Sequence, residues 1–240
     1  MDGQPLALVT GAAHRLGNTF ALTLARRGYA ILLHYYRGVD EAAATADEIC
    51  SLGVPVYLAQ ADLTDDVIIS SLLVALNSLP HHLKVLVNSA SVMSRIEIPA
   101  TSAAEWDATF ALNLRAPFLL AKQAAGRMEE GGLVVNITDA GVHKLWTGYP
   151  AYVVSKSALE TLTRVLAKEL APGIRVNAIA PGLVLPSNNI TQEEWDKLIE
   201  RLPLKHPVHL DEVAAALTFL LDNPSVTGQI VAVDGGYSII

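Results

Sequence analysis

The sequence predicts an α/β fold: a parallel sheet of about seven strands with helices on both faces. Three observations support this fold class. Short apolar runs alternate with longer helical segments along the chain. Strict alternation of strand and helix requires right-handed crossovers, which place helices on both faces of a parallel sheet. Apolar residues make up 51% of the chain and charged residues only 17%, as expected for strands buried on both faces.

The expected elements follow one another without a linker, repeat or low-complexity stretch. Strands are predicted at residues 6–10, 29–35, 54–60, 84–88, 133–138, 174–179 and 229–233. Helices are predicted at residues 16–27, 40–51, 65–79, 152–170 and 210–221. This order is typical of a Rossmann-type doubly wound sheet. Residues 1–240 are therefore expected to form one domain.

One long irregular region interrupts this alternation, at residues 183–208. Pro186, Pro203 and Pro207 surround a short predicted helix at residues 192–202. The region follows the carboxyl end of a predicted strand, and ligands bind at this edge of parallel sheets. Long loops in compact domains are commonly lids or binding loops, so residues 183–208 are predicted to form a substrate loop.

Composition argues against several classes of protein. The formal net charge is −7 and the basic residues are scattered, which argues against a nucleic-acid partner. Cys50 is the only cysteine, so no internal disulfide can form. No run reaches the roughly 20 apolar residues of a membrane span, and the first residues do not have the pattern of a targeting segment. We therefore expect a cytoplasmic protein without a membrane partner.

A glycine-rich turn, TGAAHRLG at residues 10–17, follows the first predicted strand. Glycine lets the backbone approach a pyrophosphate, and the helix that follows offers free N–H groups. A tight turn without a ligand explains the glycines equally well when they are taken alone. As a nucleotide site, the turn would bind through Gly11, Arg15, Leu16 and Gly17.

The end of the second predicted strand indicates which nucleotide binds. An NAD site has a carboxylate here for the ribose 2′-hydroxyl, and a carboxylate repels a 2′-phosphate. This sequence instead has HYYR at residues 34–37, and its first acid, Asp40, lies in the next helix. Arg37, helped by Arg15 and His34, can pair with a 2′-phosphate, so NADPH is expected. Solvated surface charge is the alternative explanation of both arginines.

Tyr152 and Lys156 lie one helical turn apart and share one face of a predicted helix. A free tyrosine titrates near ~10, and a lysine ammonium beside it would lower its pKa. Such a tyrosine can donate a proton while a nicotinamide reduces a carbonyl or an imine. The alternative is an interface tyrosine beside a surface lysine, because this spacing is common.

Together with the glycine turn, NSAS at residues 88–91, Asn113 and Pro181-Gly182, this pair resembles the short-chain dehydrogenase/reductase family. The resemblance covers essentially the whole chain. It implies that Tyr152 donates the proton, that Lys156 activates it and binds the cofactor ribose, and that Asn113 anchors a proton-relaying water. Family members are usually tetramers, so a homotetramer is expected.

The resemblance also implies further contacts to the cofactor. Asp62 would accept a hydrogen bond from the adenine amino group, although a helix cap explains this residue equally well. The other cofactor contacts implied are Asn88, Ala90, Ser91, Lys156, Pro181 and Gly182.

Asp139 stands where most members of the family have a serine, and it resembles the pteridine reductase branch. A carboxylate repels a developing oxyanion but suits a substrate with N–H donors, such as a pterin. The expected activity is NADPH-dependent reduction of a dihydropterin or dihydrofolate to the tetrahydro form. An Asx turn is the alternative for Asp139, and Thr138 could supply the hydroxyl for ordinary carbonyl reduction.

Two other functions stay open: an NADPH-dependent carbonyl or 3-oxoacyl reductase, and a non-catalytic nucleotide-binding scaffold. Met93 stands where pteridine reductases commonly have a phenylalanine that stacks on the pterin. His206 and His209 lack further ligands nearby in the sequence, so no metal is predicted. The expected substrate contacts are Arg15, Met93, Asp139, Tyr149, Tyr152 and Leu183, with Trp146 and Trp195 as further wall candidates.

Overall fold

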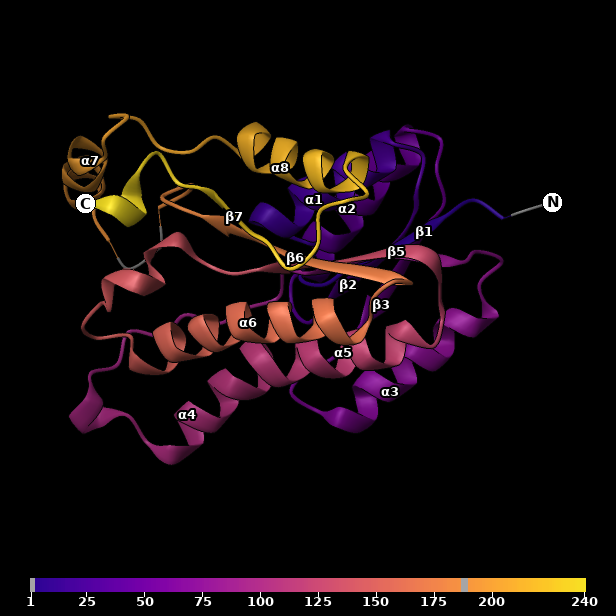
Figure 1. Cartoon of the computed structure of the whole chain (residues 1–240), viewed down its shortest axis with the longest axis horizontal. Coiled ribbons are helices and arrows are strands. Elements are labelled where there is room, and N and C mark those ends of the chain that lie inside the picture. Colours follow the sequence, from indigo (N-terminus) through magenta and orange to yellow (C-terminus); the bar gives the residue numbers. More distant parts are fainter. Residues whose placement is uncertain (1–2, 187–189) are drawn as a thin grey trace.

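The computed structural model describes residues 3–186 and 190–240 and contains a seven-stranded sheet (Figure 1). The strands lie in the order β3-β2-β1-β4-β5-β6-β7, and each neighbouring pair is parallel. The predicted single-domain, doubly wound parallel sheet is confirmed. The strands are β1 (Leu6–Val9), β2 (Ala30–Tyr35), β3 (Val56–Gln60), β4 (Leu83–Asn88), β5 (Met128–Ile137), β6 (Ile174–Pro181) and β7 (Ile230–Val233).

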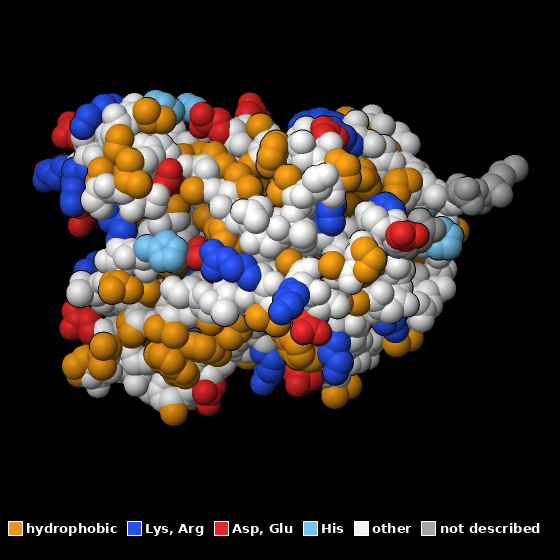
Figure 2. All heavy atoms as spheres, viewed as in Figure 1, with side chains coloured by type: hydrophobic (Ala, Val, Ile, Leu, Met, Phe, Trp, Pro, Cys, Tyr) orange, Lys and Arg blue, Asp and Glu red, His pale blue; other side chains and the backbone are white. Residues whose placement is uncertain are grey.

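Helices cover both faces of the sheet (Figure 1). One face carries α1 (Arg15–Arg26), α2 (Val39–Ser51) and α8 (Leu210–Asp222). The other carries α3 (Asp66–Ala75), α4 (Ala103–Phe110), α5 (Ala116–Ala125) and α6 (Pro150–Glu169). Each face has its own apolar core, one around Phe20 and Leu217 and the other around Leu73 and Leu120. In the same view, hydrophobic side chains also gather on the surface over α4 (Figure 2).

The helices predicted from the sequence do not include α4 and α5. The structure shows that α4 begins at a capping box formed by Ser102 and Glu105. Between the two helices lies a π-helical turn, Ala111–Arg115. A π-turn inserts one residue into the helix and is frequent at functional sites. Asn113 lies in this turn.

The bounds of the predicted elements agree with the structure within two residues, with two exceptions. Strand β5 begins at Met128 rather than at residue 133, because Met128 pairs with Leu83 beyond a register shift. Helix α3 ends at Ala75, and a short 3₁₀ turn, Leu76–Ser78, completes the segment that was predicted as one helix. Neither difference moves a predicted site residue.

The carboxyl ends of the strands form one edge of the sheet, where crossovers leave β1 and β4 in opposite directions and open a crevice for ligands. The predicted substrate loop follows β6 at this edge and contains α7 (Gln192–Arg201). Residues 187–189 of that loop lie outside the described residues. In the part of the chain that is described, no helix combines the length and apolar character of a membrane span.

Candidate active site

A cavity of about 1180 Å³ lies at the carboxyl ends of the strands. It extends from the turn between β1 and α1 to the loop after β6, with the start of α6 along one side. Two of the site residues predicted from the sequence, Asn88 and Asn113, do not line the cavity. The predicted site residues that line it are Gly11, Arg15, Leu16, Gly17, His34, Arg37, Asp62, Ala90, Ser91, Met93, Asp139, Tyr149, Tyr152, Lys156, Pro181, Gly182 and Leu183.

The glycine turn is folded tightly enough that only glycine fits at two positions. Gly11 has φ +64°, and a Cβ at Gly17 would lie 2.1 Å from the Gly11 carbonyl oxygen. Thr10 fastens the turn to the loop after β4, because its Oγ1 accepts the N–H groups of Ser89 (2.9 Å) and Ala90 (3.0 Å). The backbone at this end of the cavity is therefore held in one arrangement.

His34 supports the same turn from β2. Its Nδ1 accepts the N–H of Gly11 (3.2 Å), and its Nε2 donates to the carbonyl of Ala61 (3.0 Å). Burial lowers the pKa of His34 to about 4, so the ring is neutral at physiological pH. A neutral ring held between two backbone groups cannot pair with a phosphate as a cation. The help that we expected from His34 at the 2′-phosphate therefore has no support in this geometry.

The far end of the cavity, beyond the turn, is polar. The Arg37 guanidinium lies 5.1 Å from the centre of the Tyr36 ring. Asp62 accepts the N–H (2.9 Å) and hydroxyl (2.7 Å) of Thr64, and these hydrogen bonds hold the pKa of Asp62 below its usual value. His14 lies against Gly38, where an added Cβ would be 2.5 Å from its Nε2. Sequence reasoning missed His14, although it belongs to the glycine turn.

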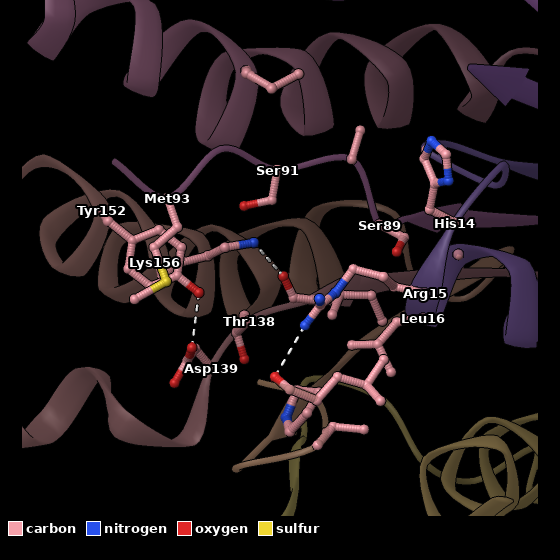
Figure 3. A pocket seen from close by; sticks show the side chains of 18 of the residues that line it. His14, Arg15, Leu16, Ser89, Ser91, Met93, Thr138, Asp139, Tyr152 and Lys156 are labelled. Atoms are coloured by element: carbon pink, nitrogen blue, oxygen red, sulfur yellow. Dashed lines mark hydrogen bonds between the residues drawn. The ribbon is translucent and has the colours of Figure 1, made fainter. Parts of the chain in front are cut away.

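Asp139, Tyr152 and Lys156 meet at the opposite end of the cavity (Figure 3). The Tyr152 hydroxyl donates to Asp139 Oδ2 (2.7 Å), and the N–H of Gly141 donates to Oδ1 (2.7 Å). Lys156 Nζ donates to the carbonyl oxygen of Ile137 (2.7 Å) and lies 6.0 Å from the Tyr152 ring centre. Both oxygens of the carboxylate and the hydroxyl are thus held in fixed directions.

Burial controls the protonation of these three groups. It raises the pKa of Asp139 and lowers the pKa of Lys156 to about 8. Burial and the neighbouring Asp139 carboxylate raise the pKa of Tyr152 well above its usual value. We expected Lys156 to lower the pKa of Tyr152; here burial and Asp139 outweigh any such effect, and the net shift is upward. The hydroxyl bonds to Asp139 rather than to Lys156.

Asn113 lies behind the cavity wall and is fully buried. Its Oδ1 accepts the N–H of Val92 (2.9 Å) and the hydroxyl of Ser91 (3.2 Å). Its Nδ2 donates to the carbonyl of Val92 (2.9 Å) and to Ser155 Oγ (3.1 Å), and Ser155 in turn donates to the carbonyl of Tyr152 (2.8 Å). Asn113 therefore connects the loop after β4 to the turn of α6 that carries Tyr152. The proton-relaying water stays a prediction.

Aromatic side chains surround Tyr152 on the substrate side. The Trp146 ring lies parallel to Tyr152, with centres 6.4 Å apart and a 2° angle between planes. A Cβ at Gly141 would lie 2.0 Å from Trp146 Cζ2, so glycine is needed there. Tyr149 and Tyr237 also contact Trp146, each at 6.1 Å between centres. Tyr237 was missed because it comes from the end of the chain, far from the other site residues in sequence.

His206 and His209 lie outside this cavity lining. Their rings stack with centres 6.0 Å apart. In residues 3–186 and 190–240, no group of three or more His, Cys, Asp or Glu side chains could hold a metal ion. The absence of a metal from this protein stays a prediction.

Comparison with known proteins identifies the class to which this fold and site belong. A family model described as enoyl-(acyl carrier protein) reductase matches residues 11–238. This match covers almost the whole chain, including the glycine turn, the Tyr152–Lys156 pair and the last strand. The chain belongs to the short-chain dehydrogenase/reductase family and is an oxidoreductase.

Three individual proteins illustrate the similarity. The 1-cyclohexenylcarbonyl-CoA reductase of Streptomyces collinus is 32% identical, over all of this chain and 89% of that protein. The 3-oxoacyl-[acyl-carrier-protein] reductase FabG of Staphylococcus epidermidis is 30% identical, over 96% of this chain and 97% of that protein. FolM alternative dihydrofolate reductase 1 from Brucella suis, in a crystal structure in complex with NADP, is 38% identical in sequence. The two structures superpose with a TM-score of 0.93, over 100% of this chain and 97% of that chain.

The cofactor is NADP(H), as expected from the sequence. The cavity fits this cofactor at one point that does not depend on the comparison. At the end of β2, Arg37 lines the cavity in the place where NAD sites have a carboxylate.

Proposed function

We propose that this protein uses NADPH to reduce a dihydropterin or dihydrofolate to its tetrahydro form. The observation that carries this proposal is the 2.7 Å hydrogen bond from the Tyr152 hydroxyl to the Asp139 carboxylate. A carboxylate beside the proton donor can accept N–H groups from a pterin ring, and it disfavours the oxyanion of a simple ketone. The 38% identity to a protein named alternative dihydrofolate reductase supports the same substrate class.

NADPH, when bound, supplies the hydride. The Tyr152 hydroxyl is protonated and donates its proton to the ring nitrogen that the hydride leaves negative; its raised pKa opposes this transfer, and the negative charge on that nitrogen drives it. The ionised Asp139 accepts N–H groups of the ring, and after transfer it takes up a proton from solvent and passes it to the Tyr152 phenolate, which burial favours by raising the pKa of Asp139. Lys156, with a pKa of about 8, stays mostly protonated at neutral pH and holds the cofactor ribose.

The rest of the substrate end supports a flat ring. Met93 and Trp146 line the cavity beside Tyr152, with Tyr149 and Leu183. Methionine packs well against aromatic rings, so Met93 can contact the pterin face where the related enzymes use phenylalanine. This assignment makes the residues of the predicted substrate site one continuous wall.

Reduction of a carbonyl or a 3-oxoacyl thioester is the second candidate. The 30% identity to FabG and the family model both favour it. Thr138, which would have to supply the hydroxyl in place of the usual serine, is 3% exposed, and its Oγ1 lies 3.4 Å from the carbonyl of Ile179. Thr138 lines the cavity, but a hydroxyl directed at the Ile179 carbonyl is poorly placed to donate to a substrate oxygen, and this geometry favours the pterin.

The initial rate of NADPH oxidation tests the two candidates. The substrates are 7,8-dihydrobiopterin, 7,8-dihydromonapterin, dihydrofolate and a 3-oxoacyl thioester, each with and without methotrexate. We expect turnover of at least one pterin or folate, suppressed by methotrexate. Turnover of the thioester alone would overturn the proposal, and NADPH binding without any turnover would favour the scaffold. In Asp139→Ser, which introduces the serine of most relatives, the rate with the pterin or folate should fall more than the rate with the 3-oxoacyl thioester.

We also infer a homotetramer formed through α5 and α6. Phe118 on α5 and Val154 and Val165 on α6 are 40%, 45% and 50% exposed. Exposed apolar side chains on adjacent helices are typical of subunit interfaces. Sedimentation equilibrium tests the inference, and a monomer at micromolar concentration would contradict it. A cytoplasmic location stays a prediction.

A further inference from the structure

Arg15 adopts a backbone conformation that is uncommon for a residue with a side chain. Its φ is +50°, in the left-handed region, at the first residue of α1. The guanidinium donates from one nitrogen to the carbonyl of Leu185 (3.0 Å) and from the other to the carbonyl of Pro186 (3.2 Å). Figure 3 shows this side chain reaching from the glycine turn toward the loop after β6.

The left-handed residue makes two adjacent basic side chains diverge. His14, the residue before it, lies against Gly38, one residue beyond Arg37. Arg15 instead reaches the segment that follows Gly182. The two basic residues of the turn therefore lie toward opposite ends of the cavity, and only His14 is beside Arg37.

We propose that Arg15 is a positioning residue that holds the start of the substrate loop against the cofactor cavity, and that it leaves recognition of the 2′-phosphate to Arg37. This assignment replaces the phosphate contact expected for Arg15 from the sequence. It rests on the cofactor being NADP(H) and is independent of which substrate is reduced.

The loop segment is fastened at its base and held again by Arg15. The N–H of Gly182 donates to the carbonyl of Val233 (2.9 Å), and the carbonyl of Leu183 accepts the N–H of Val208 (2.9 Å). Arg15 then takes the carbonyls of Leu185 and Pro186, two and three residues further on. Leu183, Val184 and Leu185 line the cavity, so the tether decides where that wall stands.

The chemistry of the tether requires arginine. Two carbonyl oxygens on successive residues match two N–H groups of one planar guanidinium. A lysine ammonium carries the same charge, but its N–H groups all leave one nitrogen, so it does not match the spacing and fixed plane of the two guanidinium nitrogens. A phosphate ligand behaves differently, because it is attracted by charge and tolerates lysine in place of arginine. This difference makes the two roles separable.

Three variants test the proposal. Arg15→Asn removes the guanidinium while keeping a residue that tolerates the left-handed backbone. Arg15→Lys keeps the charge, and Arg37→Gln is the comparison at the phosphate end. For each, equilibrium titration measures the dissociation constants of NADPH and NADH, and hydrogen exchange measures the protection of the amides of Gly182 and Val208, which donate to the carbonyls of Val233 and Leu183 at the base of the loop. Neither readout requires turnover, so the outcome does not depend on the pterin assignment.

We expect Arg15→Asn and Arg15→Lys to accelerate exchange of the Gly182 and Val208 amides and to leave the preference for NADPH over NADH unchanged within about twofold. Arg37→Gln should lower that preference by about tenfold, the effect of losing roughly 1.4 kcal/mol, and leave the exchange unchanged. A selective loss of NADPH binding in Arg15→Asn that lysine restores would make Arg15 a phosphate ligand. Unchanged exchange in both Arg15 variants would show that Arg15 does not stabilise the start of the substrate loop. Either result would overturn the proposal.

Discussion

The two ends of the cavity are built differently. The cofactor end is made mainly of backbone: the turn at Gly11 and Gly17, fastened by Thr10 and His34, leaves N–H groups bare at the start of α1. The other end, where we propose that the substrate binds, is made of side chains around Tyr152. A backbone site tolerates change wherever the chain path is kept, whereas a side-chain site changes with each substitution. A family can therefore keep one cofactor while its substrates vary.

The largest expected effect is a loss of turnover without a loss of cofactor binding, on substitution of Tyr152. Tyr152→Phe keeps the ring that packs on Trp146 but removes the hydroxyl. We expect kcat to fall by about 10²- to 10⁴-fold, the usual contribution of a positioned acid. The dissociation constant of NADPH should stay the same, because the hydroxyl bonds only to Asp139 among the described residues. Parallel loss of cofactor binding would mean that the two ends are not independent.

The cofactor end should be most sensitive to substitutions that displace its backbone. In Gly17→Ala, the new Cβ would lie 2.1 Å from the Gly11 carbonyl oxygen, so the turn must shift. We expect a loss of about 1–3 kcal/mol in the free energy of unfolding, together with weaker NADPH binding. Urea unfolding and cofactor titration measure both. Gly126→Ala is the matched control, because its Cβ would lie 3.9 Å from the Gln123 carbonyl oxygen. An equal loss in the two variants would refute the steric explanation.

The stability of the cofactor end should depend on pH through His34. Its pKa is about 4 in the folded protein against about 6.5 unfolded, so the unfolded chain binds a proton first as the pH falls. The stabilisation is present above pH ~6.5 and is lost as the pH falls toward 4, by about 2 kcal/mol between pH 7 and pH 5.

Asp139 acts in the opposite direction, because its pKa is raised by burial. The His34 contribution is therefore measured as a difference between the wild-type protein and His34→Gln, by urea unfolding at both pH values. The variant lacks the titrating ring, so its stability should fall less between pH 7 and pH 5. Identical pH dependence in the two proteins would show that His34 is not buried as a neutral ring.

The smallest expected effect is at the aromatic wall. Trp146→Leu removes the ring that lies parallel to Tyr152. Aromatic pairs contribute about 0.5–1.5 kcal/mol, so KM for the substrate should rise by about two- to tenfold without a change in NADPH affinity. Trp106→Leu, which removes a tryptophan that stacks on Phe110 in α4, should leave KM unchanged. An equal KM in the two variants would show that Trp146 does not contribute to substrate binding.

Much of the cofactor end could be predicted from the sequence because its residues are contiguous. Two short segments, TGAAHRLG at residues 10–17 and HYYR at residues 34–37, are each sufficient to predict a part of the nucleotide site. The orientation of single side chains within those segments was less predictable. Arg15 and His14 point in different directions because of one left-handed residue, and His34 is buried because β3 brings Ala61 against it.

The protonation of the candidate catalytic residues differs most from what the sequence suggested. Helical spacing placed Lys156 beside Tyr152 and suggested a lowered tyrosine pKa. In the structure, the end of β5 brings Asp139 to the hydroxyl and takes Lys156 to the carbonyl of Ile137. A pKa depends on burial and on every charge nearby, and these are properties of the packed protein rather than of one helix.

By itself, the sequence determined the fold class, the family and the cofactor. Alternating strands and helices can bury their apolar faces in few ways, and a nucleotide turn is a local structure. Only the tertiary structure decided which side chains meet. Tyr237 reaches Trp146 from the end of the chain, Arg15 reaches Leu185 across 170 residues, and Asp139 meets Tyr152. Such contacts depend on how distant segments pack, which no local pattern specifies.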